Sequence, residues 1–434
     1  MPLRAPRQRL RGCALNLLAL ALALTPAAPG ARALDIGAGD GDDVSTARQR
    51  MLLAYGWPAS WGDSPSALAA DVAEARSLAS RLLPNGTWPD VNYSDPQDRT
   101  IWLTAQHTQR VQLMAAAVSF AASPAFNDPA LFDPTRRAFE AWLVGNYTNG
   151  NWWWTILQTP QTVAVSFLML DTLPPVAGRT PFPSAYELSA SLAVTFRAAW
   201  WDSALGYIVT GANLAWLVQA QLLRAVWPSN VNASALDGGF ARLWEEVKIA
   251  PWVPGCGING ACNGTNQGIQ ADASWHFHGP QLQTAQYGQD ALSDDLAFMA
   301  VADGTRWAMP ADRAQILCFF VAGMAWASAG PGMDWAAAGR AMDRSSWGAV
   351  SKVVVNATLL HLLAPRCNTS ELAAVVAAFA DSLNSSAPTA AVVQGNRHFW
   401  TSDYMVHKRL GWSASWHGLS NRTMPNECGA SPNV

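Results

Sequence analysis

Charged residues are scarce in this sequence. Asp, Glu, Lys and Arg make up 14% of its 434 residues, against about 25% in an average globular protein. The 28 basic and 31 acidic side chains leave a formal net charge of −3, so no positive field would attract nucleic acid, and we expect no nucleic-acid partner. Hydrophobic residues reach 50%, which excludes an intrinsically disordered chain because enough apolar surface is present to form a core.

Patterns for metal binding and membrane spanning are also missing. The six cysteines form no C-x-x-C pair, and there is no H-E-x-x-H motif, so no zinc site is indicated. His276 and His278 could form a strand-type metal pair, but no third ligand stands at a familiar spacing; we expect neither a metal nor another cofactor. The apolar run 316–329 follows Asp312 and Arg313 and is short for a bilayer, which favours a buried helix over a membrane span.

The N-terminus has the form of a secretory signal peptide. Arginines precede the apolar run 14–24, and the small-residue site Ala31-Arg32-Ala33 follows it. This pattern predicts a signal peptide over residues 1–33 and a secreted, extracellular product; the alternative is an N-terminal core helix. Asn-x-Ser/Thr sequons are dense, as expected of a glycoprotein. They stand at Asn85, Asn92, Asn146, Asn232, Asn263, Asn356, Asn368, Asn384 and Asn421.

Cysteine pairing is only partly indicated by the sequence. Cys256 and Cys262 flank a Gly/Asn-rich loop and are expected to form a short disulfide in an oxidising compartment. Cys318 lies inside an apolar run, which predicts a buried free thiol. Cys367 with Cys428 is a further candidate pair.

Apolar residues recur at helical spacing through most of the chain, which predicts a mainly α fold. Residues 34–48, rich in Gly and Asp, are predicted to be a linker. After about residue 390 the pattern changes to period two with aromatic residues, which indicates strands that the chain does not extend into a full sheet. The helices are expected near 68–82, 111–118, 130–144, 162–173, 185–203, 213–227, 235–248, 285–302, 310–328 and 371–383.

Tryptophan is abundant, with 22 residues. An indole offers a large flat apolar face and one hydrogen-bond donor, which suits stacking on sugar rings. Trp152, Trp153 and Trp154 follow Asn151 directly, and a helix cannot bury three neighbours on one face. At least one of these indoles should therefore point away from the core; ordinary core packing with one exposed edge is the alternative.

Three further motifs carry polar side chains. Thr210-Gly211-Ala212-Asn213 opens a predicted helix, which an ordinary helix cap would also explain. The segment from Asp272 to His278 is followed by Tyr287-Gly288. Gly339-Arg340 with Arg344 places two guanidinium groups one helical turn apart, suited to a carboxylate or sulfate, although a solvated helix face is the commoner reason for such a pair.

These motifs stand in one order over residues 151–427, together with Arg422 and Asn426-Glu427. The ordered set resembles the polysaccharide lyases of family 8, the hyaluronate, chondroitin AC and xanthan lyases. The resemblance implies an incomplete (α/α) toroid as the catalytic domain, over 49–388, and the start of a truncated β-sandwich over 389–434. It also implies a cleft for an acidic polysaccharide, and we expect a monomer.

The resemblance implies a metal-independent β-elimination that removes the C5 proton of a uronic acid and breaks the bond to O4. Asn213 and His278 would neutralise the carboxylate, and Tyr287 would act as base and then as acid. Arg340 would lower the pKa of Tyr287, and Glu427 would hold Arg340 in place. The substrate-binding residues implied are Asn151, Trp152, Trp153, Tyr207, Arg344 and Arg422.

The sequence departs from the family pattern and leaves other functions open. Ile156 and Gln158 stand where the family usually has an acidic residue and a glycine. A non-catalytic carbohydrate-binding protein that keeps the aromatic cleft is the main alternative. A glycoside hydrolase would need paired carboxylates, and the adjacent Asp294 and Asp295 are expected on a solvated helix face. Nothing in the sequence separates hyaluronan, chondroitin, xanthan and algal uronates as substrates.

Overall fold

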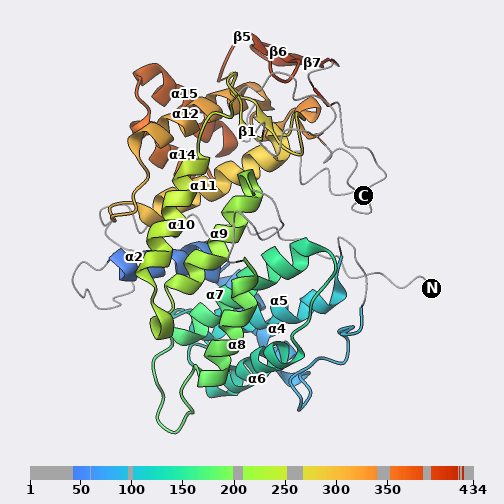
Figure 1. Cartoon of the computed structure of the whole chain (residues 1–434), viewed down its shortest axis with the longest axis vertical. Helices are drawn as coiled ribbons and strands as arrows, with labels where there is room; N and C mark the ends of the chain where they lie inside the picture. Colours follow the sequence, from blue (N-terminus) through green and yellow to red (C-terminus); the bar gives the residue numbers. More distant parts are fainter. Residues whose placement is uncertain are drawn as a thin grey trace.

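The structure is a computed structural model that describes residues 43–58, 60–95, 101–198, 209–251, 267–339, 352–384, 392–418, 420 and 423–424. Figure 1 shows a helical body with a small antiparallel sheet at one end. One group of helices, α4 to α8, lies at the opposite end from the group α11 to α15, and α9 and α10 run between them. The fold is mainly α with the start of a sheet region, as the sequence predicts.

The helices follow the predicted order closely. Three short ones, at 43–51, 60–63 and 357–363, were not predicted from the sequence. Within the described residues the helices are α2 (Asp43–Met51), α3 (Ser60–Asp63), α4 (Pro65–Ser80), α5 (Gln106–Ser119), α6 (Pro129–Gly145), α7 (Thr159–Asp171), α8 (Ala185–Thr195), α9 (Gly211–Ala225), α10 (Ala233–Glu246), α11 (Gln289–Ala302), α12 (Ala311–Trp326), α14 (Ala357–Leu363) and α15 (Ser370–Asn384).

Helix ends are fixed by local signals in the sequence. Asp128 caps α6, which has Pro129 in its first turn. Ser184 and Glu187 form a reciprocal capping box at the start of α8. Helices that follow one another along the chain pack as neighbours, α4 on α5, α5 on α6 and α9 on α10, while α7 packs against both α5 and α9. This pairing builds the incomplete (α/α) toroid.

The linker predicted over residues 34–48 is wrong for its last part, because α2 begins at Asp43. Val44, Ala47 and Met51 lie on the buried side of α2, at helical spacing, and α2 packs against α11. Arg50 Nη1 also donates to Val301 O at 3.1 Å. The Gly/Asp composition concealed a helix that is stabilised by tertiary packing rather than by its own propensity.

Three strands form the sheet near the end of the chain, β5 (Gly395–Phe399), β6 (Tyr404–Arg409) and β7 (Trp412–His417). They pair antiparallel in the order β5-β6-β7. Phe399, Tyr404 and Val406 are buried, whereas β7 is largely exposed. Two short hairpins lie within the helical body, formed by β1 (Gly268–Ile269) with β2 (Trp275–His276) and by β3 (Ser328–Ala329) with β4 (Gly332–Met333).

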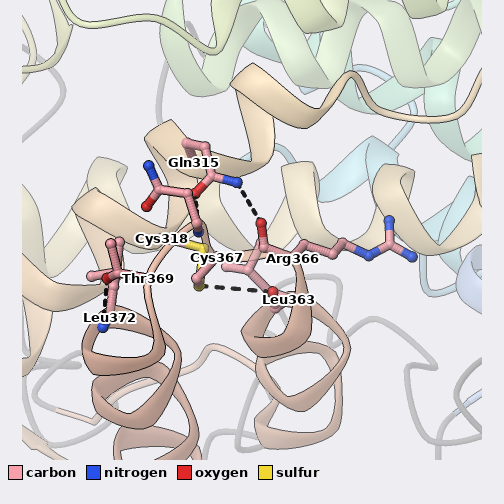
Figure 2. The surroundings of a disulfide bond; sticks show 8 residues. Gln315, Cys318, Leu363, Arg366, Cys367, Thr369 and Leu372 are labelled. Atoms are coloured by element: carbon pink, nitrogen blue, oxygen red, sulfur yellow. Dashed lines mark hydrogen bonds between the residues drawn. A yellow bond between two sulfur atoms is a disulfide. The ribbon is translucent and has the colours of Figure 1, made fainter.

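A disulfide joins Cys318 of α12 to Cys367, in the turn between α14 and α15 (Figure 2). The predicted free thiol at Cys318 is therefore wrong, and Cys367 is not available to Cys428. The cause is the packing of α12 on α15, which brings the two Cα atoms within 5.8 Å, a normal disulfide separation. Cys256 and Cys262 lie outside the described residues, so their pairing stays a prediction. Among the described helices, none is long and apolar enough to cross a membrane.

Candidate active site around Phe277

Two of the predicted catalytic residues, and the helical turn that carries a third, lie around the ring of Phe277. Its centroid lies 4.2 Å from that of Tyr287 and 4.7 Å from that of His278. Asn213 belongs to the first turn of α9, and that turn is packed against the same ring, because a Cβ atom on Gly211 would lie 2.8 Å from Phe277 Cε2. Three separate elements thus meet at one buried aromatic side chain, which is 1% exposed.

The start of α9 is held in a defined position. Gly211 has φ +61°, a left-handed conformation that glycine adopts at little cost. Its N–H donates to Glu246 Oε1 at 2.8 Å, and Arg242 forms an ion pair with Glu246 at 3.1 Å. A carboxylate that accepts from the first N–H of a helix is favoured by the helix dipole. The Glu246 carboxylate thus holds the turn that carries Asn213, and the Asn213 side chain is buried.

His278 and Tyr287 are presented by two unusual backbone segments. His278 has φ +58°, a conformation that is uncommon for residues other than glycine. Tyr287 lies in the π-helical turn η6 (Thr284–Gly288), and such turns are frequent at functional sites. The two ring centroids are 5.1 Å apart. His278 is half-buried and Tyr287 is buried.

Trp216 is a site residue that the sequence analysis missed. It lies on α9 three residues after Asn213, and therefore on the same face of the helix. Its ring centroid is 6.4 Å from that of Tyr287, and its side chain is half-buried. The spacing from Asn213 was the signal available in the sequence.

The tryptophan triplet divides between core and surface. Trp154 is buried and packs against Trp102 with ring centroids 6.1 Å apart. Trp152 and Trp153 are half-buried, and Asn151 Oδ1 accepts from the Trp153 N–H at 3.1 Å, where the π-helical turn η3 (Trp153–Gln158) begins.

The triplet lies beside the helix that carries Asn213. The turn η3 packs against α9, and Gln161 Nε2, in the following helix, donates to Trp216 O at 2.9 Å. The two half-buried indoles are therefore neighbours of the first site helix, not a separate aromatic patch.

Five of the predicted site residues lie outside the described residues: Tyr207, Arg340, Arg344, Arg422 and Glu427. Two described residues, Gly339 and Met424, lie near these positions in sequence. Gly339, next to Arg340 in sequence, has φ +53°, and a Cβ atom on it would lie 2.8 Å from Gln283. Met424 N donates to Pro280 O at 3.0 Å. Both contacts fall on the segment between His278 and Tyr287.

The structure places His276 and His278 in different surroundings, so they do not form a metal-binding pair. His276 is buried, and its Nε2 lies 2.8 Å from Ser402 Oγ. Burial lowers the pKa of His276 to about 4, although the charge of Asp272 opposes the shift. Within the described ranges, no three His, Cys, Asp or Glu side chains gather as metal ligands would.

The expected solvated face at Asp294 and Asp295 is wrong. Helix α11 packs against α9, α2 and α14 as well as η6, so Asp294 is buried and Asp295 is half-buried. Burial raises the pKa of Asp294 well above its usual value, and the charges of Asp290 and Asp295 add to the rise, while a hydrogen bond with Trp216 opposes it. A hydrolase pair of accessible carboxylates is not formed by these residues.

Comparison with known proteins shows similarity to polysaccharide lyases. The model of the polysaccharide lyase family 8 super-sandwich domain matches residues 394–434. Chondroitinase-AC of Pedobacter heparinus is 24% identical over 355 residues, covering 81% of this chain and 46% of that protein. These matches support the resemblance to polysaccharide lyase family 8. The chain spans about half the length of the curated relative that it matches.

Solved structures of polysaccharide lyases share the fold. A chondroitinase AC lyase structure superposes with a TM-score of 0.68 at 22% identity, covering 90% of this chain and 52% of that one. The Streptomyces coelicolor A3 chondroitin AC lyase in complex with chondroitin sulphate gives 0.65 at 18% identity, with coverages of 90% and 55%. A Paenibacillus xanthan lyase gives 0.65 at 15% identity, with coverages of 88% and 37%.

Proposed function

We propose that this protein is a polysaccharide lyase that cleaves a uronic-acid-containing polysaccharide by β-elimination. The observation that carries the proposal is that His278, Tyr287 and the first turn of α9, which holds Asn213, all lie around Phe277. These three residue types suit the elimination, and Asn213 is more than 60 residues from the other two in sequence. The similarity to polysaccharide lyases of family 8 supports the same reaction.

The first requirement is to acidify the proton on C5 of the uronate. That proton is removed only if the neighbouring carboxylate is stabilised, because negative charge accumulates on it in the transition state. The Asn213 amide can donate two hydrogen bonds to the carboxylate, and we assign the His278 ring to add another. Asn213 is held by the fixed first turn of α9, so its donors need little reorganisation as the charge develops.

The second requirement is a group that takes the C5 proton and then protonates the leaving O4. Tyr287 is assigned this role, acting first as base and then as acid. The reference pKa of a tyrosine, about 10, has to be lowered by a nearby cation. We assign Arg340 as that cation and Glu427 as the carboxylate that orients it.

Sugar binding is assigned to aromatic and basic side chains near the three catalytic residues. Trp152 and Trp153 would stack on sugar rings, and Trp216 extends this surface towards Tyr287. Asn151, Tyr207, Arg344 and Arg422 complete the assigned set. The relatives named above are chondroitin AC and xanthan lyases, and we propose an acidic polysaccharide as the substrate of this protein. We further propose that the protein is a monomer, with the toroid over 49–388 and the sandwich region over 389–434.

We also propose that the protein is secreted after removal of residues 1–33. The disulfide between Cys318 and Cys367 is of the kind that persists in oxidising compartments. Several sequon asparagines are exposed, as glycosylation requires. These are Asn85, Asn92, Asn146, Asn232 and Asn368.

The direct test is the ultraviolet absorbance of an unsaturated uronate product. The secreted protein would be incubated with hyaluronan, chondroitin, xanthan and algal uronates. Absorbance should rise on at least one of them and be lost in Tyr287→Phe and Asn213→Ala, by about 10²-fold or more. Tyr186→Phe, at an exposed tyrosine of α8, should retain the wild-type rate.

Two other results would replace the proposal by the alternatives. New reducing ends without the unsaturated product would indicate hydrolysis. Retention on a polysaccharide column with neither product would indicate a carbohydrate-binding protein that does not cleave.

A further inference from the structure

A buried carboxylate connects the turn between β5 and β6 to the loop that precedes His278. Asp272 Oδ2 accepts from the Thr401 backbone N–H at 2.7 Å and from the Thr401 hydroxyl at 2.6 Å. Its other oxygen, Oδ1, accepts from the Ser274 hydroxyl at 2.7 Å and from the Ser274 N–H at 3.0 Å. Both oxygens of one carboxylate are thus occupied, one by the sheet region and one by the loop.

Ser402 extends this connection to β2. Its Oγ lies 2.7 Å from Ser274 Oγ and 2.8 Å from His276 Nε2. His276 precedes His278 by two residues, and Phe277 stands between them. A shift of the His276 ring would therefore move the ring of Phe277 and the backbone of His278 together.

The network has almost no contact with solvent, so water cannot replace a partner that is removed. The same burial excludes Ser402 and His276 as a nucleophile and base, because a polysaccharide could not reach them. The exposed fractions are 3% for Asp272, 1% for Ser274, 2% for His276, 2% for Thr401 and 0% for Ser402.

The loop before His278 needs such support because two of its residues adopt unfavourable backbone conformations. Ala273 has φ +71° and His278 has φ +58°, and strained residues of this kind persist only where their surroundings determine them. The hairpin formed by β1 and β2 has only two residues in each strand, too few to be stable alone. Arg397 Nη2 adds a further contact from β5, donating to Asp272 O at 2.7 Å.

We propose that Thr401 and Ser402 are positioning residues of the active site. Through the buried hydrogen bonds described above, they determine where His278 lies relative to Tyr287, without touching substrate. This inference rests on the proposed lyase function. A misplacement of about 1 Å at a reacting centre can reduce the rate on the order of 10²-fold, so the sheet region contributes to turnover through the geometry of the loop.

The kinetic test compares Ser402→Ala and Thr401→Val with a matched control. Each should lower kcat about 10- to 100-fold while KM changes less than about threefold, because substrate contacts are retained and only the reacting geometry is lost. Thr401→Ser keeps the hydroxyl and should restore kcat. The control is Ser119→Ala, which removes another buried hydroxyl, a 3.0 Å partner of Trp57 Nε1 in the other half of the molecule; its kcat should stay at the wild-type value.

A second measurement does not depend on activity. Hydrogen exchange of the full chain, followed by mass spectrometry, should be faster over 277–287 in Ser402→Ala and unchanged there in Ser119→Ala. Wild-type kcat in Ser402→Ala, or unchanged exchange over 277–287, would overturn the proposal.

The two measurements separate the inference from the lyase assignment. If the wild type yields no unsaturated product, the proposed function fails, and the exchange comparison still decides whether Ser402 holds the loop. If Ser402→Ala does not fold, Thr401→Val carries both measurements, because valine keeps the volume of the threonine side chain.

Discussion

At the scale of single residues, the site depends on a side chain that takes no part in the chemistry. Phe277 separates and aligns the elements that carry Asn213, His278 and Tyr287. Phe277→Leu should keep most of the apolar volume but lose the flat ring on which these elements rest. We expect a loss of about 1 kcal/mol in the free energy of unfolding and a fall of at least about tenfold in kcat.

The matched control for Phe277→Leu is Phe167→Leu. Phe167 is equally buried and stacks on Trp227 with ring centroids 3.9 Å apart, among residues that none of the proposed roles involves. Urea unfolding should give similar losses for the two variants, and the elimination rate per folded molecule should fall only for Phe277→Leu. Equal rates would mean that the ring is not needed as a template.

His107 makes the free energy of unfolding depend on pH. Its Nε2 lies 2.7 Å from Ala138 O, which can only accept, so Nε2 carries a proton; in the neutral ring Nδ1 then accepts from the Tyr93 hydroxyl at 2.8 Å. Burial lowers the pKa of His107 to about 4, although the bond to Ala138 O opposes the shift. The unfolded chain, with a His pKa of about 6.5, then binds a proton that the folded chain does not.

Stability should therefore be complete above about pH 6.5 and decrease as the pH falls towards 4, by about 1.4 kcal/mol per pH unit for this one group. Thermal unfolding from pH 7 to pH 5 would measure the slope, and His107→Gln should reduce it. An unchanged slope in His107→Gln would contradict a neutral buried His107. His276 should add a similar contribution, because its pKa is also lowered to about 4.

At the scale of elements, the disulfide fixes α12 to the α14–α15 pair. Cys318 and Cys367 are separated by 49 residues, and closing a loop of this size in the unfolded chain stabilises a protein by about 2–4 kcal/mol. Cys318→Ala with Cys367→Ala should lose this amount in urea unfolding and keep the elimination rate, because the bond lies in α12 and the α14–α15 turn, which carry none of Asn213, His278 and Tyr287. Reductant should destabilise the wild type and have a smaller effect on the double variant; equal stability of the two proteins would contradict a structural role for this bond.

The helices themselves were largely predictable from the sequence, but the packing contacts between them were not. The range 130–144 predicted from apolar spacing differs from α6 by one residue at each end, because Pro129 and a capping Asp128 mark the start. Helix α2 was missed because its apolar face is short and its stability comes from α11. The buried setting of Asp294 was missed for a related reason, since a sequence shows one helix at a time and α11 is covered on several sides.

The same distinction, between local motifs and contacts distant in sequence, applies to the residues of the site. Asn213, His278 and Tyr287 could be named from motifs, because each motif has a characteristic residue and spacing. Phe277 and Ser402 could not, since their roles depend on contacts between segments up to 128 residues apart. Cys318 was assigned wrongly because an apolar run indicates burial, and burial suits a thiol and a disulfide equally.

At the scale of the whole molecule, buried polar contacts join the sheet to the toroid at several points. Tyr404 Oη donates to Asp334 Oδ2 at 2.6 Å, and Lys408 Nζ donates to Ala325 O at 2.7 Å, at the C-terminal end of α12. A cation there is favoured by the helix dipole. Because these bonds exist only when both parts are folded, we expect the sheet and the toroid to unfold in one cooperative transition.

Tyr404→Phe tests this coupling, because it removes the hydrogen bond and leaves a half-buried acceptor at Asp334. It should lower the free energy of unfolding by about 1 kcal/mol, while circular dichroism, which follows the helices, and hydrogen exchange over 395–417, which follows the sheet, still report one common transition. Tyr186→Phe, at an exposed position, is the control and should change neither quantity. Two transitions, with the sheet unfolding first, would mean that the sheet and the toroid are independent. Thr401 and Ser402 could then hold the loop before His278 only while the sheet remains packed on the toroid.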